Sequence, residues 1–276
     1  MRTLCSLALL LAACDRPQPL VICHNANCTK PDVSKDDTLD ALTESLDQMY
    51  NGTPMLDGIE LDTFWFGAED RCLFAHDLNG STTTSAFEAA QLVADYLQNP
   101  SRASWNGERF YVFIELKGFV GESFSDEHTD AQRQLHAECA LQMAHSIYLA
   151  AQIGGHELTI GFISIRPRLL ETLTEPGLFQ FLQAQPGLEL MLIGDIFAPF
   201  DPIVPDIADF KMPLDAIEYH PRHLTVQHRE AYRALGLDLV QWQFVTTSES
   251  FAAIRKWEPK FVITNEAEVV RRWTDY

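Results

Sequence analysis

Positive charge is scarce in this sequence of 276 residues, which has 20 lysine and arginine residues against 39 aspartate and glutamate residues. The resulting net charge of −19 argues against nucleic acid as a partner, because a polyanion would be repelled. It argues equally against electrostatic docking on anionic lipid. The acidic residues are spread along the chain rather than gathered in a tail, so most of them should form a solvated surface.

Beyond its first residues, the sequence lacks an apolar run long enough to cross a bilayer, which needs roughly 20 residues. The short apolar run over 4–13 follows Arg2, as in a secretion signal, and the string Leu-Ala-Ala-Cys that ends at Cys14 resembles a bacterial lipobox. We expect residues 1–13 to be a lipoprotein signal peptide and 14–19 a linker after a lipidated Cys14. The protein would then be anchored to a membrane of the bacterial cell envelope, facing the periplasm or the exterior. An ordinary cleaved signal, with an incidental Cys14, is the alternative.

Cysteines are few, and their spacing resembles no zinc site. Four follow the leader, namely Cys23, Cys28, Cys72 and Cys139, and an exported protein can oxidise them. Four cysteines allow three complete pairings, among which sequence cannot choose. Cys28 and Cys72 both lie in predicted loops beside candidate site residues, so their pairing is the one we prefer.

A glycine-rich phosphate-binding turn after an early strand is also missing, which argues against an open doubly wound sheet. The chain instead alternates short β-rich runs with amphipathic helical stretches. Uninterrupted apolar runs such as 112–114 and 190–193 are typical of parallel strands covered on both faces. Eight strand–helix units over 20–276 predict a single α/β domain, the (β/α)8 or TIM barrel.

The expected strands cover 20–24, 58–62, 110–115, 158–165, 188–193, 215–218, 238–244 and 261–264, with a short extra strand over 73–75. The expected helices cover 38–50, 85–98, 130–153, 166–174, 178–185, 225–235, 248–257 and 267–273.

Histidines and charged side chains lie where the early strands are predicted to end. Residues i and i+2 of a strand point to the same face, and the carboxyl ends of barrel strands converge on one opening, where polar residues are typically catalytic. We therefore expect one shared site at that opening. Its members in chain order would be His24, Glu60, Asp62, His76, Asp77, Glu115 and Lys117.

Three converging carboxylates, those of Glu60, Asp62 and Glu115, would repel one another unless a cation lay between them. A hard divalent ion, Mg²⁺ or Ca²⁺, prefers oxygen ligands of this kind. His24 and His76 could divide general-acid and general-base work, because their ordinary pKa lies near neutrality. Lys117 could stabilise a negative reacting group, as phosphoryl chemistry requires.

In this order the site residues resemble those of the glycerophosphodiester phosphodiesterase family, in the phospholipase-C-like TIM-barrel superfamily. The segments 163–170, 224–239 and 261–265 are similar to later parts of the same family. The resemblance implies that Glu60, Asp62 and Glu115 hold one metal ion and that His24 and His76 are the acid–base pair. It also implies that Lys117 contacts the phosphate of a small-molecule or lipid phosphodiester.

One residue departs from the family pattern, since Asn25 stands where an arginine usually contacts phosphate. A His-Asn pair also resembles phosphatidylinositol-type phospholipases C, in which the asparagine joins the metal ligands, and phospholipase D relatives lack the arginine too. We expect Asn25 to bind substrate or metal, and an action on lipid phosphodiesters stays open. Trp65 and Phe244 are further candidates for substrate contact. A non-catalytic envelope binding protein should have lost one of the site residues, and all are present.

Overall fold

The structure, a computed structural model, describes residues 18–28, 33–76, 83–102, 104, 107, 109–117, 128–175, 177–196, 207–243 and 246–274. The predicted signal peptide over 1–13, the lipidation site Cys14, Asp77 and Phe244 lie outside these residues. What the sequence predicts for them stays a prediction.

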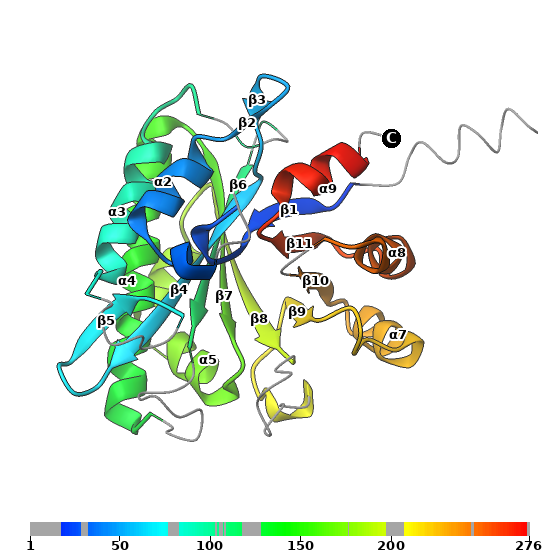
Figure 1. Cartoon of the computed structure of the whole chain (residues 1–276). Coiled ribbons are helices and arrows are strands. Elements are labelled where there is room, and N and C mark those ends of the chain that lie inside the picture. The colour runs from blue at the N-terminus through cyan, green and yellow to red at the C-terminus, as the bar shows by residue number, and fades with distance from the viewer. Residues whose placement is uncertain are drawn as a thin grey trace, which may run out of the picture.

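Eight parallel strands form a closed barrel. In chain order they are β1 (Leu20–Cys23), β4 (Gly58–Phe66), β6 (Arg109–Leu116), β7 (Glu157–Ser164), β8 (Leu188–Asp195), β9 (Ala216–Tyr219), β10 (Asp238–Gln243) and β11 (Phe261–Thr264). Figure 1 draws these strands as arrows whose colour runs from blue for β1 towards red for β11. The ring closes because β1 pairs with β11 on one side and with β4 on the other. The predicted TIM barrel is therefore confirmed.

Helices follow most of the strands and cover the outside of the barrel (Figure 1). They are α2 (Leu39–Leu46), α3 (Ala86–Leu97), α4 (Asp130–Gly154), α5 (Pro167–Thr174), α6 (Gly177–Gln183), α7 (Val226–Ala234), α8 (Ser248–Trp257) and α9 (Ala267–Thr274). Five begin at a hydroxyl that accepts a hydrogen bond from a backbone N–H of the first turn. These caps are Thr38, Ser85, Thr129, Thr225 and Thr247. Within the described ranges, none of the helices has the length and apolar character needed to span a membrane.

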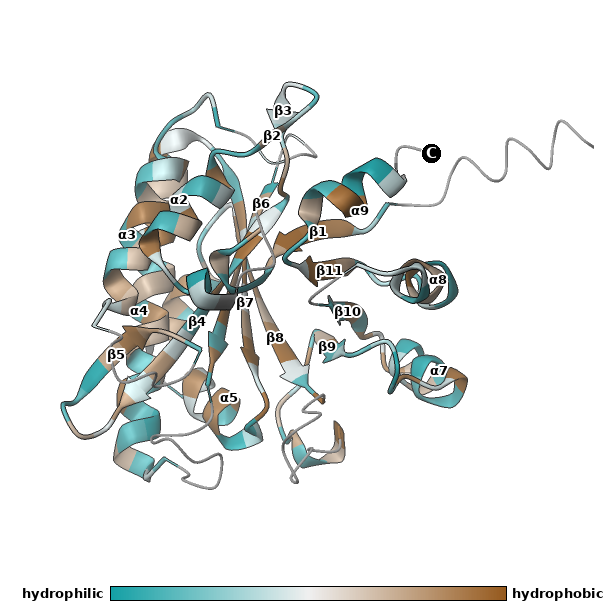
Figure 2. Cartoon of the chain, viewed as in Figure 1, coloured by the Kyte–Doolittle hydropathy of each residue, from teal (hydrophilic) through white to brown (hydrophobic). Residues whose placement is uncertain are grey.

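Apolar side chains form an inner core inside the barrel and outer layers beneath the helices. Figure 2 shows strands β7 and β8 as hydrophobic over much of their length, whereas α7 and α8 alternate hydrophobic and hydrophilic residues. Alternation along each strand sends every second side chain inward. The inner core consists of Ile22, Phe113, Ile163, Met191, Ile193, Ala216, Val240, Phe261 and Ile263.

A buried ion pair ties the last helix to the amino-terminal end of the barrel. Arg271 of α9 is 1% exposed, and its Nη2 lies 2.6 Å from Oδ2 of Asp57. Its Nε donates to the carbonyl of Met55 at 2.8 Å, and the same Asp57 oxygen accepts the backbone N–H of Val21 at 2.8 Å. Asp57 therefore joins α9, β1 and the start of β4.

Two short segments differ from the prediction. The helix predicted over 38–50 ends at Leu46, and the chain then forms a hairpin of β2 (Met49–Tyr50) and β3 (Thr53–Pro54). Asn51 and Gly52 both have positive φ there, which is the turn that an Asn-Gly pair favours. The extra strand predicted over 73–75 is β5 (Arg71–Phe74), which pairs antiparallel with an extension of β4 beyond its predicted end.

The preferred pairing of Cys28 with Cys72 is wrong. The disulfides join Cys23 to Cys28 and Cys72 to Cys139, with Cα separations of 5.4 Å and 6.5 Å. A short 3-10 turn, η1 (His24–Ala26), follows β1 and brings Cys28 back to the end of that strand. Cys72 on β5 faces α4 instead of the barrel mouth.

Candidate metal and catalytic site

Three carboxylates meet at the carboxyl ends of β4 and β6. Glu60 and Asp62 lie two residues apart on β4, and Asp62 is the register partner of Glu115 on β6. Each offers one oxygen, and these three oxygens lie within 4.8 Å of one another. Glu60 and Asp62 are fully buried. The structure thus brings together the three residues that the sequence singled out.

The negative charges of these three carboxylates are only partly balanced by neighbouring side chains. Burial raises the pKa of Glu60 well above its usual value, and repulsion from Asp62 and Glu115 adds to the effect. Burial also raises the pKa values of Asp62 and Glu115. Oε1 of Glu60 and Oδ1 of Asp62 accept no hydrogen bond from any residue in the described ranges. Because buried carboxylate oxygens are costly without a partner, the donor set fits a hard divalent cation.

Lys117 reaches the same cluster from the residue after β6. Its Nζ lies 2.7 Å from Oε1 of Glu115 and 3.1 Å from Oδ2 of Asp62. Burial alone would lower the pKa of Lys117, but Asp62 and Glu115 reverse this and raise it well above its usual value. Lys117 is therefore a buried cation, positioned by its backbone N–H, which donates to the carbonyl of Thr63 at 2.9 Å.

His24 follows β1 directly and points one ring nitrogen at the carboxylates. Its Nδ1 lies 2.6 Å from Oδ1 of Asn265, and its Nε2 lies 4.0 Å from Oε2 of Glu60. Nδ2 of Asn265 donates to Asp36 at 3.4 Å, so Oδ1 of Asn265 accepts from His24 Nδ1–H. Burial lowers the pKa of His24 to about 3, although the bond to Asn265 opposes this. The imidazole is neutral, and its unprotonated Nε2 faces the cluster.

Asn25 sits in an unusual backbone conformation beside the cluster. Asn25 and Ala26 have φ values of 47° and 55°, in the left-handed region that costs energy for residues other than glycine. This turn directs the backbone N–H of Asn25 to Oε2 of Glu60 at 3.2 Å and its side-chain Nδ2 to Asp36 at 3.4 Å. Its buried Oδ1 accepts no hydrogen bond from the residues that the structure describes. That oxygen fits the expectation of a metal or substrate contact.

His76 follows β5 at the rim of the mouth and is exposed. The backbone N–H of Ala75 donates to the carbonyl of Asp62 at 3.2 Å, which fixes the end of β5 against the cluster. The charge of a protonated His76 adds to the lowering of the pKa of His24 and opposes the rise in the pKa of Glu115, so its ring lies within electrostatic range of both. It is positioned to exchange protons with solvent.

The structure does not bring Trp65 to this cluster. Strand alternation turns Trp65 to the opposite face from Asp62, where it packs with Cys72 and Cys139 between the barrel and α4. Trp65 is 5% exposed, so the predicted contact with substrate does not fit its position.

Sequence reasoning missed several residues at the mouth. Asn265 and Glu218 lie at the ends of predicted strands, so the rule that found the other residues could have found them. Asp36 and Asp37 lie in a loop that carries no such signal. Asp37 is nonetheless buried, and burial followed by the charge of Asp62 raises its pKa well above its usual value.

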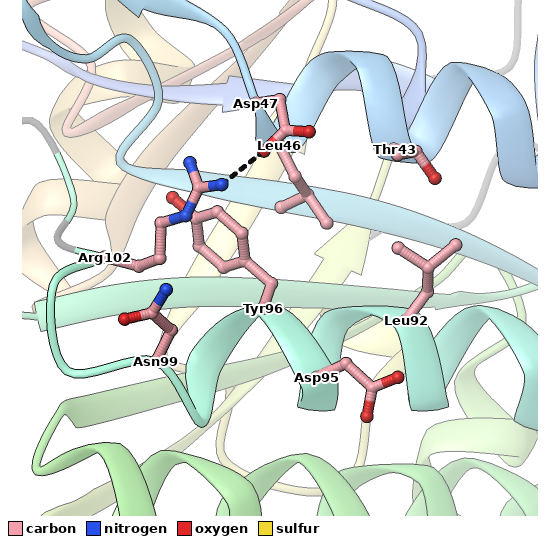
Figure 3. Close-up of a pocket in the computed structure, with 8 residues that line it drawn as sticks. All are labelled: Thr43, Leu46, Asp47, Leu92, Asp95, Tyr96, Asn99 and Arg102. Carbon is pink, nitrogen blue, oxygen red and sulfur yellow. Dashed lines mark hydrogen bonds and ion pairs between the residues drawn. The ribbon is translucent and has the colours of Figure 1, made fainter.

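A separate surface hollow of about 190 Å³ lies between α2 and α3 (Figure 3). Arg102 crosses it, with Nη2 2.6 Å from Oδ1 of Asp47 and its guanidinium 5.1 Å from the centre of the Tyr96 ring. Asp47 follows α2 and Arg102 follows α3, so the hollow lies where the chain re-enters the barrel, away from the carboxylate cluster. We assign these contacts to helix packing.

Comparison of the sequence with protein-family models gives no match, and neither does comparison with curated proteins. Solved structures do match. A candidate glycerophosphoryl diester phosphodiesterase of Silicibacter pomeroyi aligns over 94% of this chain and 93% of its own, with a TM-score of 0.60 and 13% identity. An Oleispira antarctica phosphodiesterase in complex with the product sn-glycerol-3-phosphate aligns over 94% and 98%, with a TM-score of 0.59 and 12% identity.

A glycerophosphodiester phosphodiesterase of Agrobacterium tumefaciens aligns over 93% of this chain and 100% of its own, with a TM-score of 0.52 and 15% identity. These matches span nearly the whole of both chains at low identity. The chain therefore has the barrel fold of glycerophosphodiester phosphodiesterase structures.

Proposed function

We propose that the protein is a metal-dependent phosphodiester hydrolase that releases an alcohol from glycerophosphodiesters. The observation that carries the proposal is the buried cluster of Glu60, Asp62 and Glu115 with Lys117 at the carboxyl ends of the barrel strands. Active sites of TIM-barrel enzymes lie at this end. The shared fold with structures described as glycerophosphodiester phosphodiesterases supports the same class of reaction.

Glu60, Asp62 and Glu115 would hold one divalent ion, Mg²⁺ or Ca²⁺, with Oδ1 of Asn25 as a further oxygen donor. When bound, such an ion withdraws negative charge from phosphate oxygens. The donor set contains only oxygen atoms, which favours a hard cation over zinc.

The two histidines take opposite roles in this proposal. His24 is the general base, because its Nδ1–H is committed to Asn265 and its Nε2 can accept a proton from the attacking hydroxyl. The hydroxyl oxygen forms a bond to phosphorus, and the bond from phosphorus to the departing alkoxide breaks. His76, at the solvent-exposed rim, then protonates that alkoxide, while Lys117 stabilises the charge on the phosphate oxygens.

Two further expectations stay proposals of the same kind. A phospholipase C-like or D-like reaction on lipid phosphodiesters would use the same residues, and the Leu-Ala-Ala-Cys string supports a lipid anchor at Cys14. Metabolic labelling with a fatty acid, compared between the full chain and Cys14→Ser, tests the anchor. Equal labelling of the two chains would overturn it.

The decisive assay is release of the alcohol from glycerophosphocholine, glycerophosphoglycerol and lysophosphatidylcholine. His24→Ala should lower the rate by about 100-fold or more, as loss of a general base does. His228→Ala is the matched control, because His228 is exposed on α7. Release from lysophosphatidylcholine alone would replace the proposal with a phospholipase. No release of alcohol from any of the three by folded protein would overturn the hydrolase proposal itself.

A further inference from the structure

A second pair of carboxylates lines the barrel mouth on neighbouring strands. Asp195 ends β8 and Glu218 is the third residue of β9, and the two are register partners in this parallel pair. Ile193 and Ala216, two residues earlier on each strand, belong to the inner core. By alternation, Asp195 and Glu218 also point into the barrel. They lie one layer above the core, at the end where the metal cluster lies.

Glu218 has the properties of a carboxylate that lacks its counter-ion. It is 4% exposed, and no residue of the described part of the chain donates a hydrogen bond to its side chain or forms an ion pair with it. Burial raises its pKa well above its usual value, Asp195 and then Glu60 raise it further, and the charge of Lys117 opposes this only in part. Neither Asp195 nor Glu218 belongs to the described group of carboxylates that could hold a metal ion. A buried acceptor at the carboxyl end of the barrel points to a ligand that brings positive charge.

An aromatic surface stands beside this pair. Glu218 is the register partner of Val240 on β10, and Trp242 lies two residues further along the same face. The ring centre of Trp242 is 5.4 Å from that of His24 and 5.6 Å from that of His220, and the side chain stays partly exposed. Burial lowers the pKa of His220 to about 4, so its ring is neutral. An indole next to carboxylates is a favourable environment for an organic cation.

The charges at the barrel mouth also favour a substrate that carries a positive charge. A divalent ion and Lys117 together balance the three carboxylates of the proposed metal cluster. A phosphodiester adds one negative charge, and Asp195 and Glu218 would repel it if the rest of the substrate were neutral. The positive charge of an ammonium group on the alcohol would offset part of this repulsion. We propose, on the basis of the phosphodiesterase function above, that Asp195, Glu218 and Trp242 bind the ammonium group of a zwitterionic substrate such as a choline or ethanolamine diester.

The test compares kcat/KM for glycerophosphocholine with that for glycerophosphoglycerol, which has a neutral alcohol. Glu218→Gln keeps the shape of the side chain and removes its charge, so the preference for the choline diester should fall about tenfold, the loss expected for one favourable charge contact. Asp195→Asn should shift the preference in the same direction. Glu230→Gln, an equal loss of charge on the exposed face of α7, should leave the preference unchanged.

Separate results test the ammonium site and the hydrolase activity. Wild-type hydrolysis of both diesters at equal kcat/KM, or a preference that Glu218→Gln leaves intact, overturns the ammonium site and leaves the hydrolase standing. No hydrolysis of either diester overturns the hydrolase, and calorimetric titration with choline then tests the site directly. Binding of a second Ca²⁺ that Glu218→Gln abolishes would assign the carboxylates to a metal and overturn the inference.

Discussion

Replacing Arg271 tests whether the buried ion pair at the amino-terminal end of the barrel stabilises the fold as its geometry indicates. Arg271→Met fills much of the same space but removes the guanidinium that donates to the Asp57 carboxylate at 2.6 Å, while the backbone N–H of Val21 still donates to it. Removing one partner of a buried pair costs about 3–5 kcal/mol, because an uncompensated charge stays buried. This is a large fraction of the roughly 5–15 kcal/mol that stabilises a typical domain.

The assay is urea unfolding at neutral pH, followed by tryptophan fluorescence, for four proteins. Arg272→Met is the matched control on the same helix, because its ion pair with Glu268 is exposed and should contribute no more than about 1 kcal/mol. Asp57→Asn combined with Arg271→Met removes both charges of this buried pair, so the double variant should be more stable than Arg271→Met alone. An Arg271→Met protein within about 1 kcal/mol of wild type, or a double variant that is less stable than Arg271→Met alone, would show that the pair does not stabilise the fold in this way.

Two further predictions concern histidines. His136 is fully buried and bonded to Thr63 at 3.0 Å, and burial lowers its pKa well below the usual value, so the unfolded chain binds a proton that the folded chain does not. The contribution of neutral His136 to the free energy of unfolding is therefore complete above about pH 6.5 and is lost as the pH falls. Relative to His136→Gln, the wild-type protein should lose up to about 1.4 kcal/mol of this free energy per pH unit. Equal differences in unfolding free energy at about pH 5 and about pH 8 would contradict this. Asn265→Asp should add a negative charge beside His24 Nδ1 and move the acidic limb of kcat/KM to higher pH. An unmoved limb would show that Asn265 does not position the base.

The strands and helices could be predicted because each leaves a local pattern in the sequence. Runs such as 112–114 and 190–193 are apolar throughout since both faces of a barrel strand are covered, and hydroxyl caps mark where helices begin. The hairpin over 49–54 was missed because the amphipathic pattern of α2 continues past its end. Only the Asn51-Gly52 turn indicates the change of direction.

The positions of most site residues could be predicted because these residues lie at strand ends. The prediction was wrong for residues whose neighbours depend on how separate segments pack in three dimensions. Glu60, Asp62 and Glu115 meet because parallel strands end together. The predicted contact of Trp65 with substrate was wrong because β4 extends past the barrel mouth and pairs with β5. Side chains alternate along β4, so Trp65 points to the opposite face from Asp62. The disulfide of Cys72 depends on the packing of β5 against α4, which no local pattern encodes.

We propose that the three carboxylates of Glu60, Asp62 and Glu115 hold a metal ion needed for phosphodiester hydrolysis. The most direct test of this proposal is the rate of glycerophosphocholine hydrolysis by chelator-treated protein as free Mg²⁺ or Ca²⁺ is added back. We predict that the treated protein is inactive, that activity returns as one ion per chain binds in parallel calorimetry, and that Asp62→Asn weakens both. Full activity in excess chelator would show that hydrolysis needs no bound metal ion.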